Sequence, residues 1–248
     1  MSHIHIDMEH VNFSYEKNKK ILDDITFTAR ERDCIGLIGA NGVGKSTLLK
    51  LLVGLESGYE GSIRVEEIPV SSEMLPKIRE KIGYVFQDSD SQLFMNNVYE
   101  DIAFAPRNYG LPEEEVVRCV EHAMQMTEIG HLREKSIYKL SGGEKKLVSI
   151  ATILAMTPDI ILMDEPTIAL DPRNRRNLIH ILNQFDHLKI IASHDLDMVM
   201  DTCSRVILMS DGKIVKDGDV MEILKDRELL EKNGLELPLG LQERKPQQ

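Results

Sequence analysis

Hydrophobic and polar residues alternate along the first thirty positions of the chain. Apolar side chains occupy every second position in three runs: Ile4, Ile6 and Met8; Val11, Phe13 and Tyr15; Ile25 and Phe27. A period of two is typical of a strand with one buried face and one solvent-facing face. The break at Glu9 and His10 predicts a bulge or a turn. The pattern therefore predicts an N-terminal antiparallel β subdomain with one wet face.

Later runs are continuously apolar, as expected for strands covered on both faces. They comprise residues 34–38 (CIGLI), 82–86 (IGYVF), 160–163, 190–193 and 206–209. Helical patterns follow several of these runs, over residues 46–53 before Gly54, 142–156 and 175–186. Alternating strands and helices predict an α/β fold whose core is a parallel sheet.

Residues 88–140 interrupt this alternation and have a different character. Pro112 occupies a helix start, residues 113–115 (EEE) fill the first turn, and Val116, Val120 and Ala123 lie on one helical face, together with Met124 and Thr127. We therefore expect one domain over residues 1–248 with an inserted α-helical subdomain at 88–140. Residues 218–248 are predicted to form a C-terminal tail with a short amphipathic helix and a frayed polar end.

Composition narrows the possible functions. The 248 residues include 41 acidic and 30 basic side chains, a net charge of −11, which argues against broad binding to nucleic acid. Three widely spaced cysteines favour buried thiols over disulfides or a zinc site. The longest uncharged apolar run is half the length needed to cross a bilayer, and the N-terminus has no signal core. We expect a soluble, cytosolic protein.

A phosphate-binding loop is predicted between the strand 34–38 and the helix 46–53. Residues 39–47 (GANGVGKST) satisfy G-x-x-x-x-G-K-[ST] in the strand-to-helix context that this motif requires. The glycines allow backbone N–H groups to surround phosphate oxygens, Lys45 adds a positive charge, and Ser46 can ligate Mg²⁺. The predicted nucleotide-binding residues of the loop are Gly39, Asn41, Gly42, Gly44, Lys45, Ser46 and Thr47.

Two adjacent carboxylates end the apolar strand at 160–163. In residues 160–166 (IILMDEP), Asp164 is placed to hold the Mg²⁺ shell, and Glu165 can act as general base for a water that attacks the γ-phosphate. Acidic pairs at strand ends also cap following helices, so a structural role remains open for this pair.

These motifs, together with residues 140–144 (LSGGE), occur in an order that resembles the nucleotide-binding subunits of ABC transporters along nearly the whole chain. The resemblance implies an ATP hydrolase with ATP and Mg²⁺ as cofactors. It further implies roles for Tyr15 as the adenine platform, Gln87 as a Mg²⁺ ligand and catalytic glutamine, and His194 as the histidine that contacts the γ-phosphate. Alternation alone leaves Tyr15 open to a core or surface role.

The resemblance also implies that the LSGGE segment acts on a nucleotide bound to another copy of the domain. In this family, Ser141, Gly142, Gly143 and Glu144 cap a nucleotide held by a second copy of the domain, and Asp171 contributes from a neighbouring loop. The resemblance therefore implies an ATP-dependent head-to-tail dimer, either of this chain with itself or with a paralogue. Two positions depart from the common pattern: Glu144 stands where glutamine is usual, and Ile168 where serine is usual. Neither removes a phosphate donor, a metal ligand or the base.

The segment 87–116 (QDSDSQLFMNNVYEDIAFAPRNYGLPEEEV) is similar to the CbiO-type ATPases of cobalt and nickel importers and their vitamin-importing relatives of the energy-coupling-factor group. The resemblance implies transmembrane scaffold and substrate-binding subunits as partners, peripheral attachment to the inner face of the cell membrane through them, and no nucleic-acid partner. Phe94, Met95, Val98 and Tyr99 are candidates for the groove that receives the scaffold, or for ordinary packing. A soluble ABC ATPase that acts on proteins, as in iron–sulfur cluster assembly, is the alternative, and the transported solute stays open.

Overall fold

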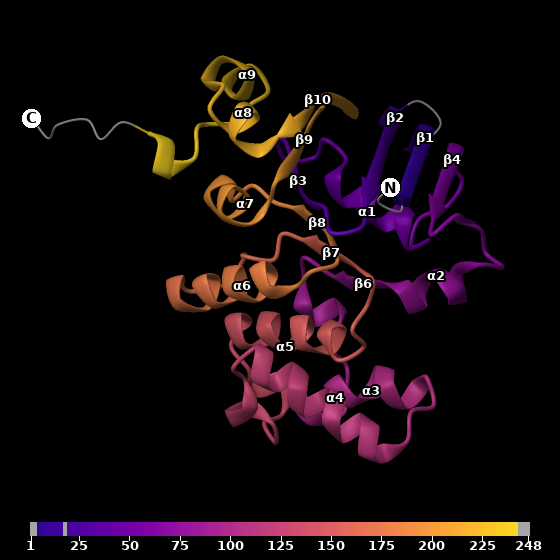
Figure 1. The fold of residues 1–248 in the computed structure, drawn as a ribbon, viewed down its shortest axis with the longest axis vertical. Coiled ribbons are helices and arrows are strands. Elements are labelled where there is room, and N and C mark those ends of the chain that lie inside the picture. The colour runs from indigo at the N-terminus through magenta and orange to yellow at the C-terminus, as the bar shows by residue number, and fades with distance from the viewer. Residues whose placement is uncertain (1–3, 17–18, 243–248) are drawn as a thin grey trace, which may run out of the picture. The chain divides into compact units, whose positions relative to one another are not determined.

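The structure is a computed structural model that describes residues 4–16 and 19–242. The chain divides into two compact units, Met1–Ile78 with His187–Gln248, and Arg79–Asp186. Residues 243–248, the end of the predicted polar tail, lie outside the described residues. Figure 1 shows the elements of both units.

The first unit contains the antiparallel sheet that the alternating pattern predicts. Its strands are β1 (Ile4–Glu16), β2 (Lys19–Arg30), β4 (Glu60–Val65) and β5 (Ile68–Pro69), in the order β2-β1-β4-β5. All three pairings are antiparallel. In β1, Ile6, Met8, Val11 and Phe13 are buried, whereas Glu9 and His10 are exposed. One face of the sheet therefore forms core.

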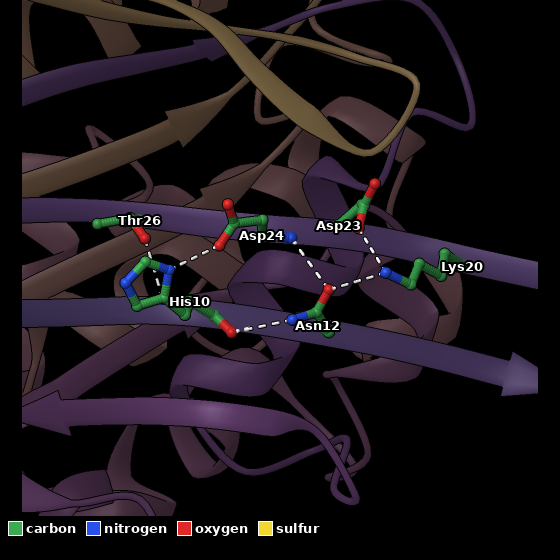
Figure 2. Close-up of polar contacts among 6 residues, drawn as sticks. All are labelled: His10, Asn12, Lys20, Asp23, Asp24 and Thr26. Atoms are coloured by element: carbon green, nitrogen blue, oxygen red, sulfur yellow. Dashed lines mark hydrogen bonds and ion pairs between the residues drawn. The ribbon is translucent and has the colours of Figure 1, made fainter.

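The predicted register break lies inside β1, which continues through it. The pairing with β2 shifts between Met8 and Val11, and His10 has a positive φ of 51°. Figure 2 shows how the polar groups around the bulge are satisfied: the His10 N–H donates to Thr26 Oγ1 at 2.9 Å, and its Nδ1 lies 2.8 Å from Asp24 Oδ1. Asn12 Nδ2 donates to the His10 carbonyl at 3.0 Å. The bulge therefore makes the pairing of β1 with β2 irregular, but these polar groups all have hydrogen-bond partners.

Parallel strands form the other half of the first unit. The apolar strand β3 (Cys34–Ile38) pairs in parallel with β8 (Leu188–Ala192) and β9 (Arg205–Ser210), and β10 (Lys213–Asp219) pairs antiparallel with β9. All five residues of β3 are buried, as their continuous apolar pattern predicts.

Short helices connect and cover these strands. They are α1 (Lys45–Leu52), α7 (Leu196–Thr202), α8 (Val220–Leu224) and α9 (Arg227–Lys232). Gly54, with φ 62°, follows the end of α1 and supports the predicted stop. The short helix predicted after residue 218 is present as α8, and a second helix, α9, follows it because Asp226 accepts a hydrogen bond from Leu229 N and caps its start.

The second unit combines two parallel strands with packed helices. The strands β6 (Ile82–Val85) and β7 (Ile160–Asp164) pair in parallel. Helices α3 (Val98–Asn108), α4 (Glu113–Met126) and α5 (Gly142–Leu154) pack against one another (Figure 1). The helix α6 (Pro172–Gln184) begins three residues before the predicted start, and α2 (Leu75–Lys81), of which only residues 79–81 belong to this unit, precedes β6. The α/β fold with an antiparallel N-terminal sheet and a helical insertion is confirmed.

Two further expectations concern the cysteines and the membrane. Cys34 and Cys203 are buried free thiols, as predicted, whereas the thiol of Cys119 is only partly buried. Across residues 4–16 and 19–242, no helix combines the length and apolar composition that a bilayer-spanning segment requires.

Gly83 in β6 provides a test of the packing between this strand and α5. A Cβ at this position would lie 2.1 Å from Ile153 Cγ2 and 3.1 Å from Pro158 Cγ. We expect Gly83→Ala to lower the free energy of unfolding by roughly 1–3 kcal/mol through overpacking, as measured by urea denaturation. Gly130→Ala is the matched control, because the added Cβ would meet nothing within 4 Å. Equal stabilities of the two variants would contradict this packing.

Candidate nucleotide site

The glycine-rich loop follows β3 directly, and its backbone conformation excludes other side chains at two positions. Gly39 has φ 150°, and a Cβ there would lie 2.4 Å from the Met209 carbonyl oxygen. Gly44 has φ 107°, and a Cβ there would lie 2.8 Å from the Ile21 carbonyl oxygen. Because neither approach is possible for a larger residue, the loop adopts its shape only with glycine.

Lys45 is folded over this loop. Its side chain is buried, and Nζ donates hydrogen bonds to the carbonyl oxygens of Gly39 at 2.7 Å and Ala40 at 3.1 Å. Ser46 and Thr47 lie in the first turn of α1, and Asn41 and Gly42 are exposed in the loop. The lysine ammonium and the positive end of α1 therefore face the same concave loop, which is the arrangement that attracts phosphate.

His194 lies at the same edge of the first unit as the loop. Leu37 of β3 pairs with Ala192 of β8 in parallel register, so both strands end at this edge. The loop begins after β3 at Gly39, and His194 is exposed two residues beyond β8. The parallel register thus brings the loop and the predicted histidine to one sheet edge, where α/β proteins bind their ligands.

The hydroxyl group of Tyr15 contacts helix α1, which follows the glycine-rich loop. Its oxygen lies 3.3 Å from Thr47 Oγ1 and donates to Glu56 Oε1 at 3.0 Å, while its ring packs edge-to-face on Phe13 with centroids 4.9 Å apart. Burial of part of the ring is the largest cause that raises the pKa of Tyr15. The side chain is nevertheless 54% exposed, so the ring is accessible beside α1, and its platform role stays a prediction.

In the second unit, Gln87 and the two carboxylates follow the ends of neighbouring parallel strands. In the parallel pair, Val85 of β6 faces Met163 of β7. Gln87 is exposed two residues after β6, whereas Asp164 ends β7 and Glu165 follows it, with 3% and 6% of their side chains exposed. Glu165 has a positive φ of 48°. Such a conformation is uncommon for a side chain larger than glycine and tends to occur at functional sites.

Lys146 is a residue near these carboxylates that the sequence did not reveal. It lies on α5, is 2% exposed, and Nζ donates to the carbonyl oxygens of Phe86 at 2.9 Å and Gln87 at 2.7 Å. Burial lowers the pKa of Lys146 to about 8, against the attraction of Asp164, Asp88 and Glu165. A lysine beside a serine–glycine motif gives no signal of burial, because lysine is usually exposed.

The LSGGE segment forms the start of α5 as a complete capping box. Ser141 Oγ accepts from the Glu144 N–H at 3.3 Å, and Glu144 Oε2 accepts from the Ser141 N–H at 2.7 Å. The other carboxylate oxygen accepts from Lys135 Nζ at 2.8 Å. The hydrogen bond from Lys135 is the main cause that lowers the pKa of Glu144. Glu144 therefore supports the exposed residues Ser141 and Gly142 from within its own helix turn.

Asp171 lies near the start of α5, at the end of the loop that joins β7 to α6. Its Oδ1 accepts from the N–H groups of Arg173 at 2.8 Å and Asn174 at 2.9 Å and so caps α6. Ser141, Glu144 and Asp171 line one hollow of about 340 Å³. The structure therefore brings the LSGGE residues and the predicted loop aspartate together on the surface of one unit.

The donors predicted for Mg²⁺ suit that ion chemically. They are a hydroxyl, an amide oxygen and a carboxylate, from Ser46, Gln87 and Asp164, and Mg²⁺ prefers hard oxygen ligands. The second unit presents Asp164 and Gln87 at the ends of neighbouring strands. Among the described residues no cluster of three His, Cys, Asp or Glu side chains is present. A few protein oxygens of this kind fit an ion that also binds nucleotide phosphates.

A glycine-rich loop between a buried strand and a helix, covered by its own lysine, together with carboxylates that end another parallel strand, defines a P-loop nucleotide hydrolase. The sequence model of the ABC transporter family matches residues 22–168. The chain therefore belongs to the ABC transporter family, as an ATP-binding and ATP-hydrolysing subunit.

Relatives extend this similarity over nearly the entire chain. A putative ABC transporter ATP-binding protein of Geobacter sulfurreducens is 45% identical over 98% of this chain and 97% of its own. The energy-coupling factor transporter ATP-binding protein EcfA of Carboxydothermus hydrogenoformans is 39% identical over 94% of this chain and 87% of its own.

Solved structures show the same fold. CbiO1 of Clostridium perfringens, described as part of the ABC transporter complex CbiONQ, has a TM-score of 0.81 and 35% identity, covering 92% of this chain and 94% of CbiO1. The dimeric structure of a bacterial ABC transporter cassette, MJ0796, has a TM-score of 0.80 and 25% identity over 87% of this chain and 98% of that one.

The cap at Asp171 yields a stability test. Asp171→Ala removes the acceptor of two N–H groups at the start of α6, and we expect the free energy of unfolding to fall by about 1 kcal/mol. Asp171→Asn keeps a capping oxygen and serves as the control, with a smaller loss. Both are measured by urea denaturation of the nucleotide-free chain. Equal losses for the two variants would show that the cap does not stabilise α6.

Proposed function

We propose that this chain is the ATP-hydrolysing motor subunit of a membrane importer of the energy-coupling-factor type. The observation that carries the proposal is its near full-length similarity to EcfA and to CbiO1, at 39% and 35% identity. Transmembrane scaffold and substrate-binding subunits would be its partners, and it would lie on the inner face of the cell membrane through them. Cobalt or nickel is the proposed solute, because the segment 87–116 resembles the CbiO-type ATPases of cobalt and nickel importers.

An exposed aromatic pair in the second unit supports contact with a membrane partner. Phe94 is 63% exposed and packs edge-to-face on Phe104, also exposed, with centroids 4.8 Å apart. The buried Asp101 carboxylate accepts from the Met95 N–H at 2.9 Å and fixes the backbone beside Phe94. Two large apolar rings held in place at the surface are suited to receive an apolar helix.

The other residues proposed for the groove lie differently. Val98 is fully buried at the start of α3, so its assignment to the groove is corrected to a core position. Tyr99 is partly buried, with the guanidinium of Arg133 at 4.2 Å and that of Arg107 at 5.7 Å from the ring centroid. The proposed docking surface is therefore Phe94 and Phe104, with Met95 beside them.

The proposed hydrolytic roles follow from the chemistry of each residue. Lys45 and the N–H groups of the loop bind phosphates, and Glu165 accepts the proton of the attacking water. His194 contacts the γ-phosphate and Gln87 orients the ion and the water. Mg²⁺, when bound, would neutralise charge on the phosphate oxygens.

The proposed working form is a head-to-tail dimer, in which Ser141, Gly142 and Gly143 of one copy cap the nucleotide held by the other. Ser141 and Gly142 are exposed at the positive end of α5 and Gly143 is partly buried there, which supports this role because such a helix end attracts an anion. ATP would then join the two copies, and hydrolysis would release them. A homodimer is sufficient, since one chain carries both halves of the site.

Glu165→Gln tests the proposed base. The amide keeps the size and the hydrogen-bonding capacity of the carboxylate but cannot accept the proton, so we expect ATP hydrolysis to fall by about 10²-fold or more while ATP affinity is retained. The variant should accumulate as an ATP-bound dimer, detected by gel filtration with light scattering.

Lys45→Ala is the matched control for this experiment. Removal of the ammonium that neutralises phosphate charge should weaken ATP binding itself and prevent ATP-dependent dimerisation. Hydrolysis by Glu165→Gln at the parental rate would rule out Glu165 as the base, and a dimer that forms without ATP would contradict the proposed clamp.

Purification from membranes tests the importer. The tagged chain, extracted with a mild detergent, should be recovered with integral membrane proteins identified by mass spectrometry. Phe94→Ala should reduce this recovery about tenfold without a change in melting temperature, because the ring is mostly exposed. Val215→Ala, at an exposed apolar residue of the first unit, should leave recovery intact. Recovery with soluble proteins alone would favour the alternative of a soluble ABC ATPase.

A further inference from the structure

The second unit contains one buried cation, Lys146, whose position is not explained by the established activity. Its ammonium is directed at the backbone of residues 86 and 87, with Nζ 2.9 Å and 2.7 Å from the two carbonyl oxygens. The side chain is 2% exposed. Burial of an ammonium is costly, so it persists only where hydrogen bonds and opposite charges compensate for lost water.

The lysine belongs to a row of contacts that fastens residues 86–92 to α5. Gln92 Nε2 donates to the Ser149 carbonyl oxygen at 2.7 Å and to Thr152 Oγ1 at 2.9 Å, and Gln92 Oε1 accepts from the Phe86 N–H at 3.2 Å. At the surface, Lys145 pairs with Asp90. The segment that carries Gln87 is therefore held on the flank of the helix that begins at Ser141.

Among these contacts, the one from Lys146 is closest to the chemistry. It is the contact made to Gln87 itself, and its charge lies near Asp164, Asp88 and Glu165, each of which attracts it. The lysine thus contacts the backbone of Gln87 and is attracted by the buried carboxylates at the end of β7. All of these residues belong to the Arg79–Asp186 unit.

We propose that Lys146 is a positioning residue that fixes the Gln87 backbone on α5, so that Gln87 and the Ser141 end of this helix move as one body. This inference rests on the roles proposed above for Gln87, Glu165 and Ser141. In this role the buried lysine keeps Gln87 in the position that ATP hydrolysis requires. Alignment of this kind matters because a displacement near 1 Å of a positioning group lowers the reaction rate about 10²-fold.

Lys146→Met tests the inference, because methionine fills a similar volume without donors or charge. We expect kcat for ATP hydrolysis by the full chain to fall about 10- to 100-fold, while KM and the equilibrium affinity for ATP change less than about threefold. A loss of general stability would instead reduce all of these together. Hydrogen exchange of the nucleotide-free chain should become faster at the amides of residues 86–92.

The neighbouring lysine provides the matched control. Lys145→Met removes the exposed pair with Asp90 from the same helix turn, and should leave kcat within about twofold and leave exchange at residues 86 and 87 unchanged. Lys146→Arg keeps both the donors and the charge and should recover at least a third of the parental kcat. Recovery no better than that of Lys146→Met would contradict the role assigned to the donors.

Glu165→Gln, measured in parallel, distinguishes a failure of the role proposed for Lys146 from a failure of the proposed base. If this variant is inactive and Lys146→Met has the parental kcat and exchange pattern, the inference on Lys146 is wrong and the proposed base stands. If Glu165→Gln hydrolyses ATP at the parental rate, the proposed site fails, and the assignment of Lys146 fails with it.

Discussion

The parallel register of the strands is the constraint on which both parts of the candidate site depend. In parallel pairs the carboxyl ends lie at a common edge, and chain segments far apart in sequence meet there. The pairing of Leu37 with Ala192 brings the glycine-rich loop and His194 to one edge of the first unit. The pairing of Val85 with Met163 does the same for Gln87 and the carboxylates of the second unit. A slip by one residue in either pair would turn the strand faces over and move these side chains away.

The sequence predicted the elements whose signal is local. The strand at 34–38 has the bounds predicted from its apolar run, and the helix at 113–126 starts after Pro112 as its acidic first turn indicates. Helix α6 starts three residues before its predicted start, because Asp171 caps it and Pro172 follows at its first position. The sequence does not predict the bounds of the helix over residues 98–108, although Asn97 caps it, since Pro106 lies inside it and argues against a helix.

Contacts between distant segments explain what the sequence could not show. Lys145 and Lys146 are identical neighbours in the chain, yet one pairs with Asp90 at the surface and the other is buried against the carbonyls of residues 86 and 87. Only the rotation of α5 against the second-unit strands distinguishes them. Likewise, no local pattern links Glu144 to Lys135 nine residues earlier. The motif residues could be named from the sequence, whereas the residues that hold them in place could not.

The capping box at the start of α5 restricts what the Ser141 hydroxyl group can offer to an outside molecule. A hydroxyl oxygen has two lone pairs and one proton. The Glu144 N–H occupies a lone pair of Ser141 Oγ, and both Glu144 oxygens are directed at donors of the same chain, the Ser141 N–H and Lys135 Nζ. The serine thus keeps its proton for an external acceptor and is less able to accept. This polarity favours an oxyanion over a donor such as an amine, so the helix start discriminates by the direction of its hydrogen bonds as well as by charge.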